Sequence, residues 1–324
     1  MKPKLLSALC TLALNMNSIA AGWERLAPLP EPNGGFVSGA VDGRVVIAGG
    51  TNWKDDAKQW LSRIHTYDPA SNTWTAAGAL PVPLAYSATG MQSGTLWLAG
   101  GASGTGMHRA LWKLQRGGET RRAFDFADGN ALAGGGIIGT TLYVLGGTDD
   151  MDRLERATNA LLAIDLRDGR VVKRTAYPEP AFITGATAVC GGRLYAFGGA
   201  HWDKATGTVV NHASAHVFDP ASDRWAKLAP LPSAIRGITA VTLDESHIFL
   251  AGGYKNDAEE FTDEAFIYDI GSGKYTATLP LPYRSMVHLV KLGDWIYCLG
   301  GEDRKKHRAD AAFRIQWKEL LPAK

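Results

Sequence analysis

The stretch Val45-Val46-Ile47-Ala48-Gly49-Gly50 runs from four apolar residues directly into a pair of glycines. The same design returns five times along the chain, where further apolar runs end at Gly100-Gly101, Gly146-Gly147, Gly198-Gly199, Gly252-Gly253 and Gly300-Gly301. Successive pairs are 51, 46, 52, 54 and 48 positions apart. The chain is therefore built from six similar units of about 50 residues each.

Each unit can be interpreted as four short strands. In the first unit a polar loop follows the glycines, and then come Ile64-His65-Thr66-Tyr67-Asp68, a turn and Trp74. The fourth unit repeats this order from His216 to Trp225. A period near 50 residues with four strands per unit is typical of a kelch-type β-propeller. The sequence thus predicts an all-β fold, a six-bladed kelch-type β-propeller over residues 21–324.

The two ends of the chain predict how the ring closes. The segment Trp23-Glu24-Arg25-Leu26-Ala27-Pro28-Leu29-Pro30 closely matches the fourth-strand segment 225–232, yet no first three strands precede it. The last unit has apolar runs for its second and third strands at 295–299 and 311–317. We therefore expect the N-terminal strand to complete the last blade, so that the ring has no open edge.

The first 20 residues are typical of a secretory signal peptide. A basic start at 1–4 precedes an apolar run at 5–14, and Ser18-Ile19-Ala20 fits a small-x-small cleavage site. The run is too short to span a bilayer comfortably, so no membrane anchor is expected after cleavage. The sequence predicts a periplasmic protein, in which Cys190 and Cys298 are interpreted as buried small hydrophobes rather than a disulfide. A net charge of +2 and a pI near 8.3 make nucleic acid an unfavoured partner.

Two kinds of loop are predicted to share one mouth of the central channel. The loops between second and third strands begin just after each glycine pair, and the blade-to-blade loops emerge on the same face because strands within a blade are antiparallel. This face carries carboxylates, arginines and aromatic residues, a mix that suits a polar ligand with an anionic group. The candidate binding residues are Arg236, Arg284, Asn33, Asn52, Tyr86 and His201. The alternative, equally weighted from the residues alone, is an ordinary polar propeller surface.

The last unit carries the sharpest pattern, Gly301-Glu302 followed by five residues and then Arg308-x-Asp310-Ala311-x-Phe313. This pattern resembles the active-site blade of the periplasmic N-acetylneuraminate epimerases, the sialic acid mutarotases. The stretch from Gly34 through Thr51-Asn52-Trp53 looks like the blade that follows it in that family. The resemblance implies a cyclically permuted member that covers essentially the whole ring.

That resemblance implies an isomerase acting on N-acetylneuraminate or a related acidic sugar. Glu302 would be the catalytic proton acceptor and Arg308 its accompanying arginine, which could also hold the sugar carboxylate. Ring opening and closure at the anomeric carbon by acid–base chemistry needs no cofactor and no metal. The alternative role for Glu302 and Arg308 is an ion pair that braces their loop.

Two other functions stay open from the sequence. One is a non-catalytic secreted propeller that binds glycans or a protein partner through the same face. The other is a copper oxidase resembling galactose oxidase, which would need a Tyr–Cys cross-link and Tyr and His ligands. The cysteines of the predicted ring lie in core strands, so a copper oxidase is disfavoured. The histidines show no spacing typical of a metal site.

Overall fold

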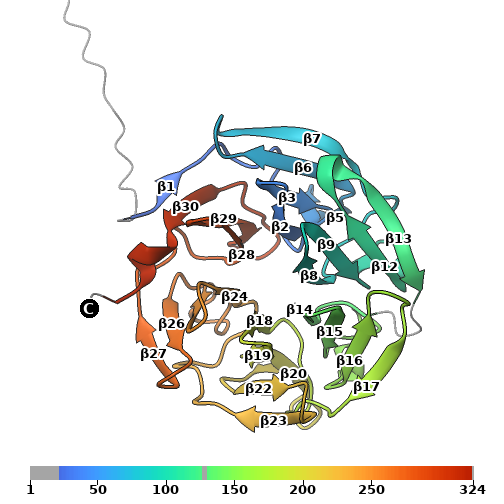
Figure 1. Ribbon diagram of the computed structural model, residues 1–324, viewed down its shortest axis with the longest axis vertical. Coiled ribbons are helices and arrows are strands. Elements are labelled where there is room, and N and C mark those ends of the chain that lie inside the picture. The colour runs from blue at the N-terminus through green and yellow to red at the C-terminus, as the bar shows by residue number, and fades with distance from the viewer. Residues whose placement is uncertain (1–21, 126–129, 323–324) are drawn as a thin grey trace, which may run out of the picture.

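The computed structural model describes residues 22–125 and 130–322, and these form a ring of six four-stranded antiparallel sheets (Figure 1). The prediction of an all-β, six-bladed propeller is confirmed. The predicted signal peptide, residues 1–20, lies outside the described residues. No helix among those described is long and apolar enough to cross a membrane.

The strands follow the order predicted by the glycine repeats, with the first strand of each blade nearest the channel (Figure 1). Blade one consists of β2 (Val37–Val41), β3 (Arg44–Ala48), β6 (Arg63–Asp68) and β7 (Thr73–Ala79). Blade two consists of β8 (Ala88–Gln92), β9 (Thr95–Ala99), β12 (Ala110–Leu114) and β13 (Thr120–Asp125). Blade three consists of β14 (Gly134–Ile138), β15 (Thr141–Leu145), β16 (Leu161–Asp165) and β17 (Val171–Arg174). Blade four consists of β18 (Ala186–Cys190), β19 (Arg193–Phe197), β22 (Ala215–Asp219) and β23 (Arg224–Lys227). Blade five consists of β24 (Thr239–Thr242), β25 (His247–Ala251), β26 (Ala265–Asp269) and β27 (Lys274–Ala277). Blade six consists of β28 (Met286–Leu292), β29 (Trp295–Glu302), β30 (Ala312–Gln316) and β1 (Glu24–Arg25).

Short elements decorate this frame. Three two-stranded hairpins extend the loops between second and third strands: β4 (Thr51–Lys54) with β5 (Ala57–Trp60), β10 (Ala102–Ser103) with β11 (Gly106–Met107), and β20 (Ala200–Asp203) with β21 (Thr208–Asn211). Three short 3₁₀ helices are η1 (Arg116–Gly118), η2 (Leu154–Arg156) and η3 (Trp317–Leu320). The hairpins enlarge the face on which the candidate residues lie.

The apolar core lies between blades rather than in one central mass. The buried residues form clusters that each draw on two neighbouring blades. The runs before the glycines supply much of this core, and in β3, for example, the last four residues are all buried. Cys190 and Cys298 are both buried and free, which confirms their interpretation as core residues. Because each blade is covered by the next, the stability of each blade depends on the ring being closed.

The glycine pairs join neighbouring blades. The second glycine of each pair donates its backbone N–H to a carbonyl in the next blade-to-blade loop, as from Gly147 to Phe182 O at 2.7 Å and from Gly301 to Asn33 O at 2.8 Å. Gly146 and Gly147 have φ of 68° and 86°, a left-handed conformation that favours glycine. A Cβ on Gly146 would also overlap the carbonyl oxygen of Phe182. The repeat therefore marks a structural requirement, which is close contact between backbones of adjacent blades.

The ring closes as predicted. Strand β1 pairs with β30, with Glu24 opposite Arg314 and Arg25 opposite Phe313. Beyond the strand, Leu26 N–H donates to Ala312 O at 2.9 Å. Trp23 is almost fully buried in the core between blades five and six, and its indole N–H donates to Pro280 O at 2.9 Å.

Candidate binding face

The two predicted kinds of loop meet on one face. Backbone bridges connect blade-to-blade loops with the start of the second-to-third loop of the same blade, for example Gly34 with Thr51 and Arg236 with Tyr254. Corresponding bridges pair Ala85 with Ala102, Ala131 with Thr148 and Ile183 with Ala200. The prediction that these loops form one mouth is therefore confirmed.

A chain of backbone hydrogen bonds surrounds most of this mouth. The N–H groups of Tyr86, Leu132, Thr184 and Gly237 each donate to the corresponding residue of the preceding blade, at 2.6–3.0 Å, beginning with Tyr86 to Gly35 O. All five residues have φ between 52° and 68°. All five residues, of which Tyr86, Leu132 and Thr184 carry side chains, line a common cavity in the channel. The mouth is thus rigidly built from successive blades.

A cavity of about 590 Å³ occupies the mouth, and a smaller one of about 210 Å³ adjoins it along the channel. The apolar lining of the larger cavity comes from several blades: Leu132, Met151, Phe261 and Met286, with the rings of Tyr86 and Tyr254. Charged groups on the same wall are Arg236, Asp257, Glu260, Glu302 and Lys305. The mouth therefore has an apolar floor and a charged rim.

Glu302 and Arg308 form an ion pair within the protein. Arg308 is only 5% exposed, and its Nη1 lies 2.8 Å from Glu302 Oε2. The same guanidinium donates to Thr51 Oγ1 at 3.3 Å and to Tyr86 Oη at 3.5 Å. Arg308 thus connects blade six to blades one and two, and its charge is already satisfied by Glu302. This arrangement fits the alternative role, a brace for the loop.

Tyr86 is the centre of this wall. Its ring covers Gly35, at which an added Cβ would overlap the ring, and it meets Trp60 edge-on at 6.0 Å. Lys58 Nζ lies 4.8 Å from the centroids of both rings. Burial by itself raises the pKa of Tyr86, but the Lys58 and Arg308 charges and the hydrogen bonds from Lys58 and Thr51 outweigh burial and lower it. This part of the wall is therefore electropositive.

The other predicted binding residues have different surroundings. Arg236 lines the cavity, stacks on Tyr254 at 4.2 Å and donates to Asn211 Oδ1 at 2.9 Å. Arg284 is exposed, is not among the residues that line this cavity, and lies 3.7 Å from Asp263. The structure thus brings Arg236 to the larger cavity together with Tyr86 and Glu302, while Arg308 lines the smaller cavity that adjoins it.

The remaining three predicted residues contact neighbouring groups of their own blades. Asn33 is buried, and its side-chain N–H donates to Gly49 O at 2.8 Å. Asn52 accepts the backbone N–H of Trp53 at 2.7 Å. His201 lies beside His212, with ring centroids 6.0 Å apart, and burial lowers the pKa of His212 to about 4. Among the described residues, no cluster of three His, Cys, Asp or Glu side chains could hold a metal ion.

The sequence analysis does not predict the apolar floor, because its candidate binding residues are charged, polar or aromatic. Leu132 occupies the position that corresponds to Tyr86 in its own blade-to-blade loop, whereas Met286, which pairs with Glu302, corresponds to Ala85. The alignment of the blade-to-blade loops is the sequence signal for such lining residues, because matching positions in repeated blades occupy matching places in the ring.

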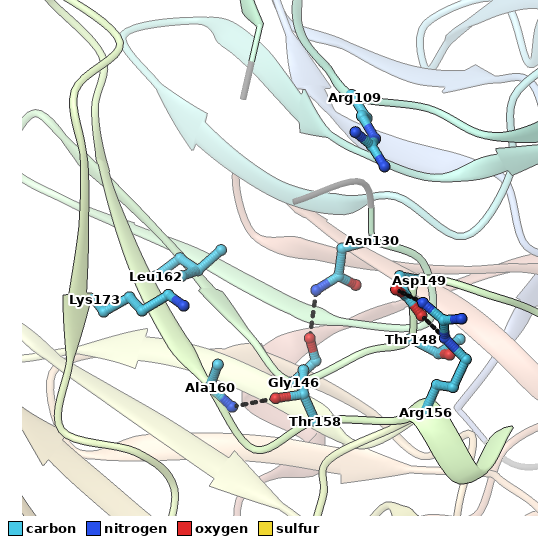
Figure 2. Close-up of a pocket in the computed structure, with 10 residues that line it drawn as sticks. All are labelled: Arg109, Asn130, Gly146, Thr148, Asp149, Arg156, Thr158, Ala160, Leu162 and Lys173. Carbon is cyan, nitrogen blue, oxygen red and sulfur yellow. Dashed lines mark hydrogen bonds and ion pairs between the residues drawn. The ribbon is translucent and has the colours of Figure 1, made fainter. Parts of the chain in front are cut away.

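Another cavity, of about 250 Å³, lies between blades two and three (Figure 2). Asn130 donates there to Gly146 O, and Arg156 pairs with Asp149. Asn33 makes the matching bond to Gly49 in blade one. The Asn130 contact is therefore part of the repeated blade architecture rather than a sign of a ligand.

Comparisons with known proteins agree with this architecture. Residues 32–81 and 185–232 match the Kelch motif. The chain is a kelch-repeat propeller. It is 25% identical to spermatocyte protein spe-26 of Caenorhabditis elegans over 93% of its length, and 27% identical to mouse Kelch-like protein 35 over 83%. Human Kelch-like protein 23 is 30% identical over 39% of this chain.

The kelch-repeat chain spans less than half of these relatives, 42% of the worm protein, 43% of the mouse protein and 22% of the human one. These relatives are a spermatocyte protein and Kelch-like proteins, and none is named as a sugar isomerase, so the assignment to the sialic acid mutarotases is wrong. The expectations of an isomerase activity and of a small acidic sugar as partner fall with it. The Glu302–Arg308 pattern that suggested them is accounted for by the ion pair.

Proposed function

We propose that this protein is a non-catalytic kelch propeller that binds a protein partner through the mouth of its channel. The observation that carries the proposal is the cavity of about 590 Å³, in which an apolar floor is surrounded by charged groups. An apolar centre within a polar rim is the usual anatomy of a protein-binding surface. Such a floor can take an apolar side chain of a partner, which suits it better than a sugar hydroxyl.

The rigidity of the mouth favours binding. The backbone chain through Gly35, Tyr86, Leu132, Thr184 and Gly237 fixes the wall before any partner arrives. A preformed site loses less conformational entropy on binding, and this increases affinity. The Arg308 brace has the same effect on the loop that carries Glu302.

The periplasmic location remains a prediction from residues 1–20.

Binding of short peptides tests this proposal. Random twelve-residue peptides displayed on phage would be selected on the wild-type protein, and the affinity of a synthetic binder would be measured by fluorescence anisotropy. We expect Leu132→Lys to weaken binding at least tenfold, because it places a charge on the apolar floor. Thr140→Lys is the matched control, since Thr140 is exposed at the opposite end of the same blade in the turn between β14 and β15.

The control should bind like the wild type. If the wild type, Leu132→Lys and Thr140→Lys bound the peptide with equal affinity, the peptide would not occupy the mouth, and the proposal would be overturned. Thermal unfolding of each variant establishes that the ring is intact.

A further inference from the structure

We propose that the partner includes an extended, basic segment that pairs as an added strand with β21. This inference rests on the proposed function and adds a groove beside the mouth to the surface that binds the partner. The groove that takes the segment lies between β21 of blade four and the turn at residues 254–259 of blade five. It encloses about 640 Å³ and is lined by all four residues of β21.

Strand β21 has a free edge. It pairs only with β20, and no third strand joins this hairpin among residues 22–125 and 130–322. The outer edge of β20 contacts η2, on the side of blade three. The outer edge of β21 therefore faces blade five. An unpaired strand edge is a ready template for an incoming strand.

The register identifies which backbone groups are available. His212 N–H donates to Gly199 O at 3.0 Å, and the pairing continues with Val210 opposite His201 and Thr208 opposite Asp203. Hydrogen bonding alternates along an antiparallel pair, so these residues direct their N–H and C=O groups toward β20. The groups of Val209 and Asn211 then point outward, to the groove.

The groove adjoins the mouth, with which it shares three lining residues. The Asn211 side chain donates to Tyr254 O at 2.9 Å and to Lys255 O at 2.6 Å, which fixes the end of β21 against blade five. Arg236, Tyr254 and Asp257 line both this groove and the central cavity. A single extended segment can therefore pair with β21 and place an apolar side chain in the mouth.

The charge of the neighbouring loop indicates a basic segment. Residues 254–264 contain five carboxylates, at Asp257, Glu259, Glu260, Asp263 and Glu264, and one lysine. That lysine, Lys255, already pairs with Glu264 at 2.7 Å and with Glu259 at 3.4 Å. Two further cations lie close by: Arg284 is 3.7 Å from Asp263, and Arg236 stacks on Tyr254 and bonds to Asn211 at the junction with the mouth. The five carboxylates still outnumber Lys255 and these two arginines, so the loop remains acidic. Lys or Arg side chains of the segment would complement this loop.

The experiment uses the peptides selected on the wild-type protein and the variant Val209→Pro. Proline removes the outward N–H of residue 209 and is tolerated at strand edges where that N–H has no partner in the sheet. We expect at least tenfold weaker binding by Val209→Pro, whereas Val209→Thr, which keeps the N–H, should bind like the wild type. The selected peptides should be enriched in Lys and Arg. Asp257→Asn combined with Glu259→Gln should weaken binding severalfold at low salt and less at high salt.

The outcomes separate this inference from the proposed function. Unchanged binding by Val209→Pro together with loss in Leu132→Lys would overturn strand addition and leave the mouth as the docking surface. Unchanged binding by both variants would overturn both. If Val209→Pro unfolds, N-methylation of alternate backbone amides in the peptide gives the same test on the wild-type protein. One alternating set should abolish binding and the other should not, and equal effects of the two sets would contradict an added strand.

Discussion

A chain that begins at residue 31 is expected to lose cooperative folding, whereas a chain that begins at Gly22 should unfold like the full-length protein. The shorter chain lacks β1, which is the fourth strand of blade six, and leaves β30 with an unpaired edge. It also lacks Trp23, whose ring fills the core between blades five and six. Thermal unfolding followed by circular dichroism would distinguish the two chains.

The substitution Trp23→Ala isolates the packing contribution. Removing a fully buried tryptophan costs about 3–5 kcal/mol, and Trp23 is 1% exposed. Trp53→Ala is a suitable comparison, because Trp53 lies half-buried on the hairpin β4–β5 outside the blade core. A truncated chain that retained the wild-type unfolding midpoint would show that β1 does not close the ring.

Gly146→Ala is expected to destabilise the protein by about 4 kcal/mol. A left-handed backbone costs a residue with a Cβ about 1–2 kcal/mol, and the lost hydrogen bond from Gly147 to Phe182 leaves a buried group unpaired, at about 1–3 kcal/mol. The new methyl group would also press against the Phe182 carbonyl. Urea unfolding measures this difference.

Gly139→Ala is the matched control in the same blade. Gly139 has φ of 61°, close to the 68° of Gly146, but a Cβ added to it would have no neighbouring atom within 4 Å. Its substitution should therefore cost only the backbone term, about 1–2 kcal/mol. Equal destabilisation by the two substitutions would refute the view that the glycine pairs hold neighbouring blades together.

The fold could be predicted from the sequence because it repeats. Six glycine pairs give the number of blades, and the similarity of segment 23–30 to 225–232 identifies the displaced fourth strand. The same repetition placed the loops on one face, where bridges such as Gly34 with Thr51 confirm them. Residue-type patterns along the chain are sufficient for these features, because each follows from the repetition of one four-stranded unit.

The function could not be predicted in the same way. The spacing of Glu302 and Arg308 is compatible with an acid–base pair and with a structural ion pair, and only their three-dimensional contacts separate the two. Arg308 reaches Thr51 and Tyr86, residues that are distant in sequence and adjacent only after the ring closes. The apolar floor also depends on this closure, since Leu132, Phe261 and Met286 come from different blades.

The most direct test of docking at the mouth is methyl NMR of the protein labelled at methionine. Met151 and Met286 line the central cavity, whereas Met91 is exposed near the opposite end of β8. Titration with a selected peptide should shift the methyl resonances of Met151 and Met286 and leave that of Met91 in place. A peptide that binds with unchanged Met151 and Met286 signals would contradict the assignment of the mouth as the protein-binding surface.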